Sequence, residues 1–196
     1  YDYTQGGGYF ITLCAQDREC LLGQIRDGKM ELNELGIIVY NQWLKLPRRY
    51  SHIGLDIFQI MPNHIHGIII VGATLAVAHP GTVAHSRAGA SPAPTIGNIV
   101  GAYKSLVANE WLKISKSRNE FMGRLWQRNY YEHVIRNEEE LNRIRQYILE
   151  NPSQWIYDRE NPQYAEAVRC SCVPEFPAVF PFLFSLLTPL LRWRRH

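Results

Sequence analysis

The stretch Met61-Pro62-Asn63-His64-Ile65-His66-Gly67-Ile68-Ile69-Ile70-Val71 joins a histidine pair to a run of β-branched residues, and that run predicts a strand. Because side chains on a strand alternate between its faces, His64 and His66 point the same way and Ile65 points the opposite way. Two imidazoles side by side on a rigid strand can bind one divalent cation or serve as a general base with its partner. A pair of half-exposed strand histidines without a chemical role is the alternative.

The segments around this strand predict the rest of a sheet. Residues 9–14 and 53–60 are rich in β-branched and aromatic residues, so each predicts a strand. A further strand carries His133. Residues 21–32 predict a hairpin, with Asp27-Gly28 as the pair that a tight turn requires.

Three other segments have the apolar spacing of amphipathic helices. Asn33 is a candidate N-cap for a helix over 34–46, Thr95 opens a helix that ends near Ile114, and a third helix spans 139–150 before Asn151-Pro152 ends it. This order of elements predicts an α+β fold, in which an antiparallel sheet has helices on one face, related to ferredoxin-like and RRM-like topologies.

Length and composition bound the organisation of the chain. Its 196 residues are enough for one well-buried domain, which we assign to residues 1–163. Residues 73–94 are dominated by Ala, Gly, Pro, Ser, Thr and His, which predicts a flexible surface insertion. Residues 164–196 are atypical and predict a poorly ordered tail. Four prolines within 173–191 argue against a membrane anchor, since they break the hydrogen bonds that a lipid-exposed helix must keep.

Charge and cysteine content restrict the partners and the compartment. A formal net charge of +3 permits a nucleic-acid partner without requiring one. The four cysteines show no paired CxxC spacing, so we expect free thiols in a reducing compartment and no zinc site.

The last predicted helix supplies a second group of candidate residues. Arg143, Tyr147 and Asn151 are spaced four residues apart and therefore share one face. A tyrosine there is either a half-buried packing residue or a nucleophile.

Four motifs occur in one order along the chain: Tyr-Phe-Ile-Thr at 9–12, Met-Pro-Asn-His-Ile-His-Gly at 61–67, Trp-Gln-Arg-Asn-Tyr-Tyr-Glu-His at 126–133 and Arg-Gln-Tyr-Ile-Leu-Glu-Asn-Pro at 145–152. Together they resemble the REP-associated tyrosine transposases, relatives of the single-strand insertion-sequence transposases in the HUH superfamily. The resemblance covers residues 1–163.

This resemblance implies an HUH transposase fold with specific roles for four residues. It makes His64 and His66 a metal-binding pair, Tyr147 the nucleophile and Asn151 a third ligand of Mg²⁺ or Mn²⁺. The implied activity is a DNA transposase or single-strand endonuclease that cleaves and rejoins hairpin-containing single-stranded DNA through a 5′-phosphotyrosine intermediate. A monomer or homodimer in the bacterial cytoplasm, associated with the nucleoid, is the implied context.

Further residues are candidates for DNA contact, and two other functions stay open. Lys104, Arg128 and Arg143 are candidates for contacts to phosphates, and Tyr131 either stacks on unpaired bases or packs in the core. His133 either contributes to the site or DNA contact or is an ordinary strand histidine. The alternative functions are a non-catalytic DNA-binding protein derived from a transposase and a metal-dependent hydrolase that uses water.

Overall fold

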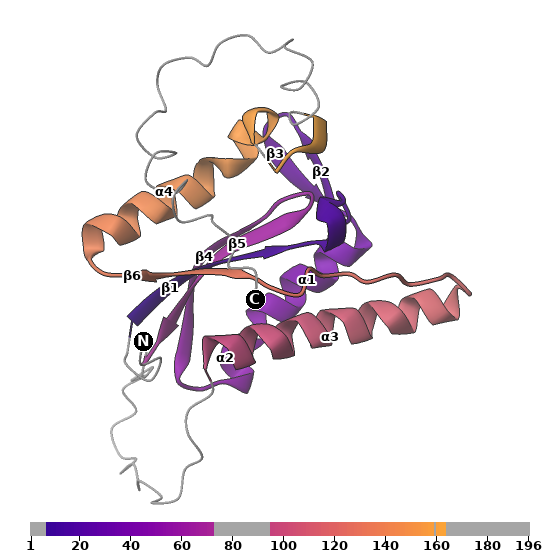
Figure 1. Ribbon diagram of the computed structural model, residues 1–196, viewed down its shortest axis with the longest axis horizontal. Coiled ribbons are helices and arrows are strands. Elements are labelled where there is room, and N and C mark those ends of the chain that lie inside the picture. The colour runs from indigo at the N-terminus through magenta and orange to yellow at the C-terminus, as the bar shows by residue number, and fades with distance from the viewer. Residues whose placement is uncertain (1–6, 73–94, 159, 164–196) are drawn as a thin grey trace, which may run out of the picture.

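The computed structural model describes residues 7–72, 95–158 and 160–163. The expectations of a flexible insertion at 73–94 and of a poorly ordered tail at 164–196 lie outside these residues. Figure 1 shows the described strands and helices, which are β1 (Gly7–Cys14), β2 (Gly23–Arg26), β3 (Lys29–Leu32), β4 (Ile53–Ile60), β5 (His64–Val71) and β6 (Tyr131–Ile135), with α1 (Glu34–Leu44), α2 (Leu46–Arg49), α3 (Ile96–Ser117), α4 (Glu138–Gln154) and the 3-10 turns η1 (Gln16–Arg18) and η2 (Trp155–Tyr157).

Four strands form an antiparallel sheet in the order β4-β5-β1-β6, and β2 and β3 pair separately as a hairpin. Helix α1 lies in the connection from β1 to β4, and α3 lies in the connection from β5 to β6. This strand order and these crossovers are those of the ferredoxin-like topology. The α+β prediction with an antiparallel sheet is therefore confirmed.

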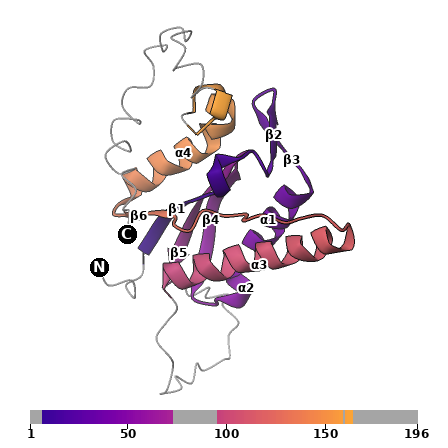
Figure 2. The ribbon, with the colours of Figure 1, turned by 45° about the vertical axis from the view of Figure 1, so that its right-hand side comes forward.

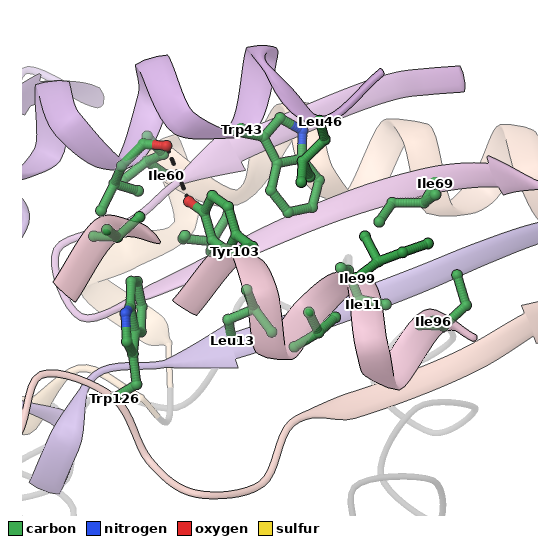
Figure 3. Close-up of a cluster of buried hydrophobic side chains, with 14 of the residues drawn as sticks. Ile11, Leu13, Trp43, Leu46, Ile60, Ile69, Ile96, Ile99, Tyr103 and Trp126 are labelled. Atoms are coloured by element: carbon green, nitrogen blue, oxygen red, sulfur yellow. Dashed lines mark hydrogen bonds between the residues drawn. The ribbon is translucent and has the colours of Figure 1, made fainter. Parts of the chain in front are cut away.

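One face of the sheet carries the main core. Alternate residues of β1, Tyr9, Ile11 and Leu13, are buried against α1 and α3 together with large side chains such as Trp43 and Tyr103. Figure 3 shows part of this cluster, in which the Tyr103 hydroxyl donates a 2.9 Å hydrogen bond to the Val39 carbonyl and so joins α3 to α1.

The opposite face is covered by α4, as both ribbon views show (Figures 1 and 2). Phe10 of β1 and Ile68 of β5 pack there against Ile144 and Ile148. The expectation of helices on one face is thus right for α1 and α3 and wrong for α4. The apolar stripe of α4 packs on the second face because β1 and β5 present apolar residues on that face as well.

The ends of the elements follow local chemistry, with two corrections. The turn of the β2–β3 hairpin has positive φ at both Asp27 and Gly28, as a type I′ turn requires. Asn33 caps α1 by accepting from Gly36 N at 2.9 Å. The predicted helix over 34–46 stops at Leu44, and a separate helix, α2, begins at Leu46 with Pro47 in its first turn, where the missing N–H has little cost. Helix α4 continues through Pro152 to Gln154 instead of ending before it. Pro152 lacks the N–H that would bond to the carbonyl four residues earlier, and the helix ends two residues later.

Candidate active site

The histidine pair lies on β5, between β4 and β1, and both side chains are buried beneath α4. His64 is 0% exposed and His66 is 5% exposed, so the alternative of half-exposed histidines is wrong. Their Nε2 atoms are 3.0 Å apart. Because β5 is hydrogen-bonded on both sides, its backbone holds the two imidazoles in a fixed relation.

The other ring nitrogen of each histidine also has a partner. Asn63 Oδ1 lies 2.7 Å from His64 Nδ1, and Thr12 Oγ1 lies 2.8 Å from His66 Nδ1. Thr12 faces His66 because the two residues are opposite each other in the β1–β5 register. Partners of this kind orient imidazoles that bind metal ions. Sequence reasoning missed both residues, although Asn63 precedes His64 directly and Thr12 closes the first motif of the chain.

Helix α4 brings Tyr147 and Asn151 to the same place. The Tyr147 hydroxyl is 3.3 Å from His66 Nε2, and its ring meets Phe10 edge-on with centroids 6.2 Å apart. Asn151 is 4% exposed, and its Oδ1 atom is buried without a hydrogen-bond partner. A buried polar atom without a partner is costly, and such atoms in native proteins are associated with function or with an absent ion or water.

Burial controls the ionisation of these groups. It lowers the pKa of His64 to about 3, with the nearby Arg18 acting in the same direction. Burial also lowers the pKa of His66 well below its usual value, and the adjacent His64 adds to the effect. Both imidazoles are therefore neutral at neutral pH, the form that binds a metal ion. Burial makes the largest contribution to the pKa of Tyr147 and raises it. The charge of Asp158 raises it further, whereas a hydrogen bond from Asn151 lowers it. The phenol is thus protonated in this environment.

The donor set suits a divalent cation of the predicted kind. No group of three His, Cys, Asp or Glu side chains that could hold a metal ion occurs in the described part of the chain. The available set is different: two neutral imidazole nitrogens, from His64 and His66, and the unpartnered amide oxygen of Asn151. Mixed nitrogen and oxygen donors without thiolate fit Mn²⁺ or Mg²⁺ better than a soft ion.

The chain that follows α4 forms another wall of the site. The ring of Trp155 in η2 is 6.1 Å from the ring of His64. Glu160 forms a 2.8 Å ion pair with Arg18, whose backbone has a left-handed φ of 59°. Burial raises the pKa values of both Asp158 and Glu160. None of these residues was expected from sequence, because their proximity to the histidines depends on how α4 ends.

Of the four residues expected to contact DNA, two are exposed and two contact other parts of the protein. Arg143 on α4 and Arg128 before β6 are exposed. Lys104 lies on α3, across the sheet from α4, and its Nζ donates to the Gln127 and Asn129 carbonyls at 2.9 Å each. Tyr131 packs edge-on against Phe10 on the α4 face, and its hydroxyl is buried without a partner.

His133 lies on strand β6 and its side chain contacts that of Glu140 on α4. Its Nε2 atom lies 2.8 Å from Glu140 Oε1, and the second oxygen of Glu140 accepts from the Arg136 backbone N–H. This contact joins the sheet to the first turn of α4.

The chain resembles a bacterial protein over most of its length. It is 38% identical over 164 residues to an uncharacterised protein of Haemophilus influenzae, and the match spans 81% of this chain and 87% of the relative. No family model matches the chain. No helix within the described residues is both long and apolar enough to cross a membrane.

Two solved structures are similar to this chain, each at 16% sequence identity. One is a REP-associated tyrosine transposase bound to a REP hairpin, with a TM-score of 0.49 over 89% of this chain and 86% of that chain. The other is a candidate transposase from Deinococcus radiodurans, with a TM-score of 0.45 over 76% of this chain and 93% of that chain.

Proposed function

This chain belongs to one family with the uncharacterised Haemophilus influenzae protein, and we propose that it is a metal-dependent tyrosine transposase that cleaves and rejoins single-stranded DNA. The proposal rests on the four ordered motifs and on one observation above all. The Tyr147 hydroxyl lies 3.3 Å from His66 Nε2, so a helix on one face of the sheet delivers a phenol to a buried histidine pair.

The neighbours of Tyr147 favour this role over simple packing. A packing tyrosine needs one hydrogen-bond partner, whereas this one shares its surroundings with two neutral imidazoles and with an amide oxygen that has no partner. His64, His66 and Asn151 would hold Mg²⁺ or Mn²⁺. When bound, the cation supplies positive charge that stabilises the scissile phosphate and the departing oxygen.

Tyr147 is the residue that reacts. Attack of its hydroxyl oxygen on phosphorus forms a Tyr–O–P bond and breaks the P–O3′ bond. The tyrosine gives up its proton, and the leaving 3′-oxygen gains one, so the products are a 5′-phosphotyrosine and a free 3′-hydroxyl. Because the phosphodiester energy is kept in the protein–DNA bond, a second 3′-hydroxyl can reverse the step and join strands without ATP.

Substrate and context follow from the motif resemblance. We propose a DNA hairpin of the repetitive extragenic palindrome type with adjacent single-stranded bases, bound in the cytoplasm of a bacterium and at its nucleoid. Exposed Arg128 and Arg143 are the candidates for phosphate contacts. Tyr147 reaches His66 of its own chain, which supports attack within a monomer rather than across a homodimer.

An adduct assay tests the proposal. The full chain is mixed with labelled single-stranded hairpin DNA and Mn²⁺, and covalent protein–DNA bands are sought on a denaturing gel. We expect a band that is lost in Tyr147→Phe and in His64→Ala and that persists in Tyr40→Phe, a control at an exposed tyrosine of α1. DNA binding without a band in the parent chain would instead favour a non-catalytic DNA-binding protein, and cleavage without a band would favour a hydrolase.

A further inference from the structure

The side chain of Asn63 has a single allowed orientation. Its Nδ2 atom is 3.0 Å from the Arg18 carbonyl oxygen and 2.6 Å from the Glu160 carbonyl oxygen. Carbonyl oxygens only accept hydrogen bonds, so the amide NH₂ must face them and Oδ1 must face His64. Since Oδ1 is also only an acceptor, the hydrogen in its 2.7 Å bond with His64 belongs to Nδ1 of the imidazole.

This assignment determines the tautomer of the second histidine. With hydrogen on Nδ1, the neutral ring of His64 has a lone pair on Nε2, which faces His66 Nε2 at 3.0 Å. Two lone pairs at that distance repel, so His66 carries its hydrogen on Nε2 and donates it to His64. His66 Nδ1 is then an acceptor, and the Thr12 hydroxyl, 2.8 Å away, is the donor.

If both Nε2 atoms are to bind a cation, only one of the two histidines, His66, must change its tautomer. His64 already presents its lone pair, whereas His66 must lose the hydrogen on Nε2 and gain one on Nδ1. Its net charge does not change, because solvent takes up one proton and supplies the other. Thr12 must then accept from His66 Nδ1 instead of donating to it. A hydroxyl can do both by rotating about the Cβ–Oγ bond.

We propose that Asn63 holds His64 permanently in the tautomer that binds a cation, while His66 changes tautomer on cation binding and Thr12 permits the change by reversing its hydrogen bond. The proposal rests on the proposed cation site. It assigns Asn63 and Thr12 as positioning residues that act through the histidines, and it explains why one histidine is paired with an amide oxygen and the other with a hydroxyl.

The same assignment has a consequence for Tyr147. His66 donates its Nε2 hydrogen to His64 at 3.0 Å, so the 3.3 Å contact from His66 Nε2 to the Tyr147 hydroxyl oxygen is a weaker, shared one. When that hydrogen leaves, this shared contact no longer holds the tyrosine oxygen.

Nitrogen NMR of the full chain tests the proposal without an activity measurement. Long-range ¹H–¹⁵N spectra of ¹⁵N-histidine-labelled protein distinguish the two tautomers. In the cation-free protein we expect hydrogen on Nδ1 of His64 and on Nε2 of His66. Addition of Mg²⁺, which is diamagnetic, should move the His66 hydrogen to Nδ1 and leave His64 unchanged. Either histidine in the opposite starting tautomer, or no change at His66 with Mg²⁺, overturns the proposal.

Substitutions at Thr12 separate the hydroxyl from the shape of the side chain. Thr12→Ser keeps the hydroxyl and should keep the change at His66. Thr12→Val keeps the shape, and we expect it to block the change and to weaken Mg²⁺ affinity on the order of 10-fold. If both variants show the same tautomer change at His66 and the same Mg²⁺ affinity, the role of Thr12 is overturned. If Thr12→Val does not fold, the spectra of the parent chain and of Thr12→Ser still test whether His66 changes tautomer.

The adduct assay keeps this inference apart from the proposed function. The expected tautomers with no covalent adduct would support the inference and reject the transposase, whereas an adduct with an unchanging His66 would do the reverse.

Discussion

Arg145 on α4 binds the carboxylate of Asp56 on β4 through two hydrogen bonds, Nε to Oδ1 at 3.1 Å and Nη2 to Oδ2 at 2.5 Å. Asp56 lies where the β4–β5 register shifts between Leu55 and Phe58. Arg145 lies two residues before Tyr147, so the ion pair connects this part of α4 to the edge strand of the sheet.

Loss of this ion pair should have a small effect on stability that depends on pH. Arg145 is 40% exposed at its side chain, so solvent screens the pair, and we expect Arg145→Met to lower the free energy of unfolding by about 0.5 kcal/mol at pH 7. The hydrogen bond from Arg145 lowers the pKa of Asp56 below 3.8. The contribution is thus present above pH 3.8 and is lost as pH falls through the lower folded-state value.

Urea unfolding of the parent chain and the variant from pH 7 to acid measures this difference. Arg143→Met, at an exposed position two residues earlier, is the control with little expected change. A difference that stays constant through the acid range would contradict the assignment.

Gly67 within the histidine motif has a packing role. A Cβ at this position would lie 2.4 Å from Trp43 Cζ2 and 3.2 Å from Phe58 Cβ. We expect Gly67→Ala to destabilise the fold by about 1–3 kcal/mol through overpacking. Gly101→Ala is the matched control: a Cβ there meets nothing within 4 Å, and alanine favours a helix over glycine, so thermal unfolding should show equal or higher stability. Similar effects of both substitutions would contradict the packing role.

Lys104 should matter for stability. Its ammonium donates to two carbonyls of the 127–129 segment, and burial lowers its pKa to about 8. Lys104→Met leaves those carbonyls without that donor, so we expect a loss of about 1–3 kcal/mol in the free energy of unfolding. Lys113→Met, at an exposed position of the same helix, should change it little. Unchanged stability together with weaker binding of single-stranded DNA would instead indicate the phosphate contact that its charge first suggested.

Asn151 should affect cation binding more than folding. Its buried Oδ1 atom has no partner, so replacement by leucine removes an unsatisfied acceptor along with one ligand of the proposed cation. We expect Asn151→Leu to fold and to bind Mn²⁺ at least about 10-fold more weakly in a calorimetric titration. Unchanged Mn²⁺ affinity would exclude Asn151 as a ligand.

Much of the fold was predictable because its local signals are strong. The strand over 53–60 is found with those bounds, and the Asp27-Gly28 turn and the Asn33 cap are found where the residue types require them. The packing face of α4 was not predictable. An apolar stripe shows that a helix is buried on one side, but it does not show which face of a sheet receives it.

The grouping of the candidate site residues was predictable in part, but their environment was not. Alternation on a strand places His64 and His66 on one face, and four-residue spacing on a helix does the same for Tyr147 and Asn151. Their roles stay predictions. The burial of the histidines depends on α4 lying above them, and the partners Asn63 and Thr12 depend on side-chain orientation and sheet register. These are tertiary properties that no local pattern contains.

The candidate site residues lie far apart in the sequence, so the ribosome synthesises them at different times. Tyr147 follows His66 by 81 residues, and it lies on the last long helix of the described chain. Domains form as the chain emerges from the ribosome, beginning with its N-terminal part. A nascent or prematurely terminated chain that already holds both histidines therefore lacks the tyrosine to which we assign the attack. Translation itself would delay the proposed strand cleavage until the segment that forms α4, Glu138–Gln154, has been synthesised.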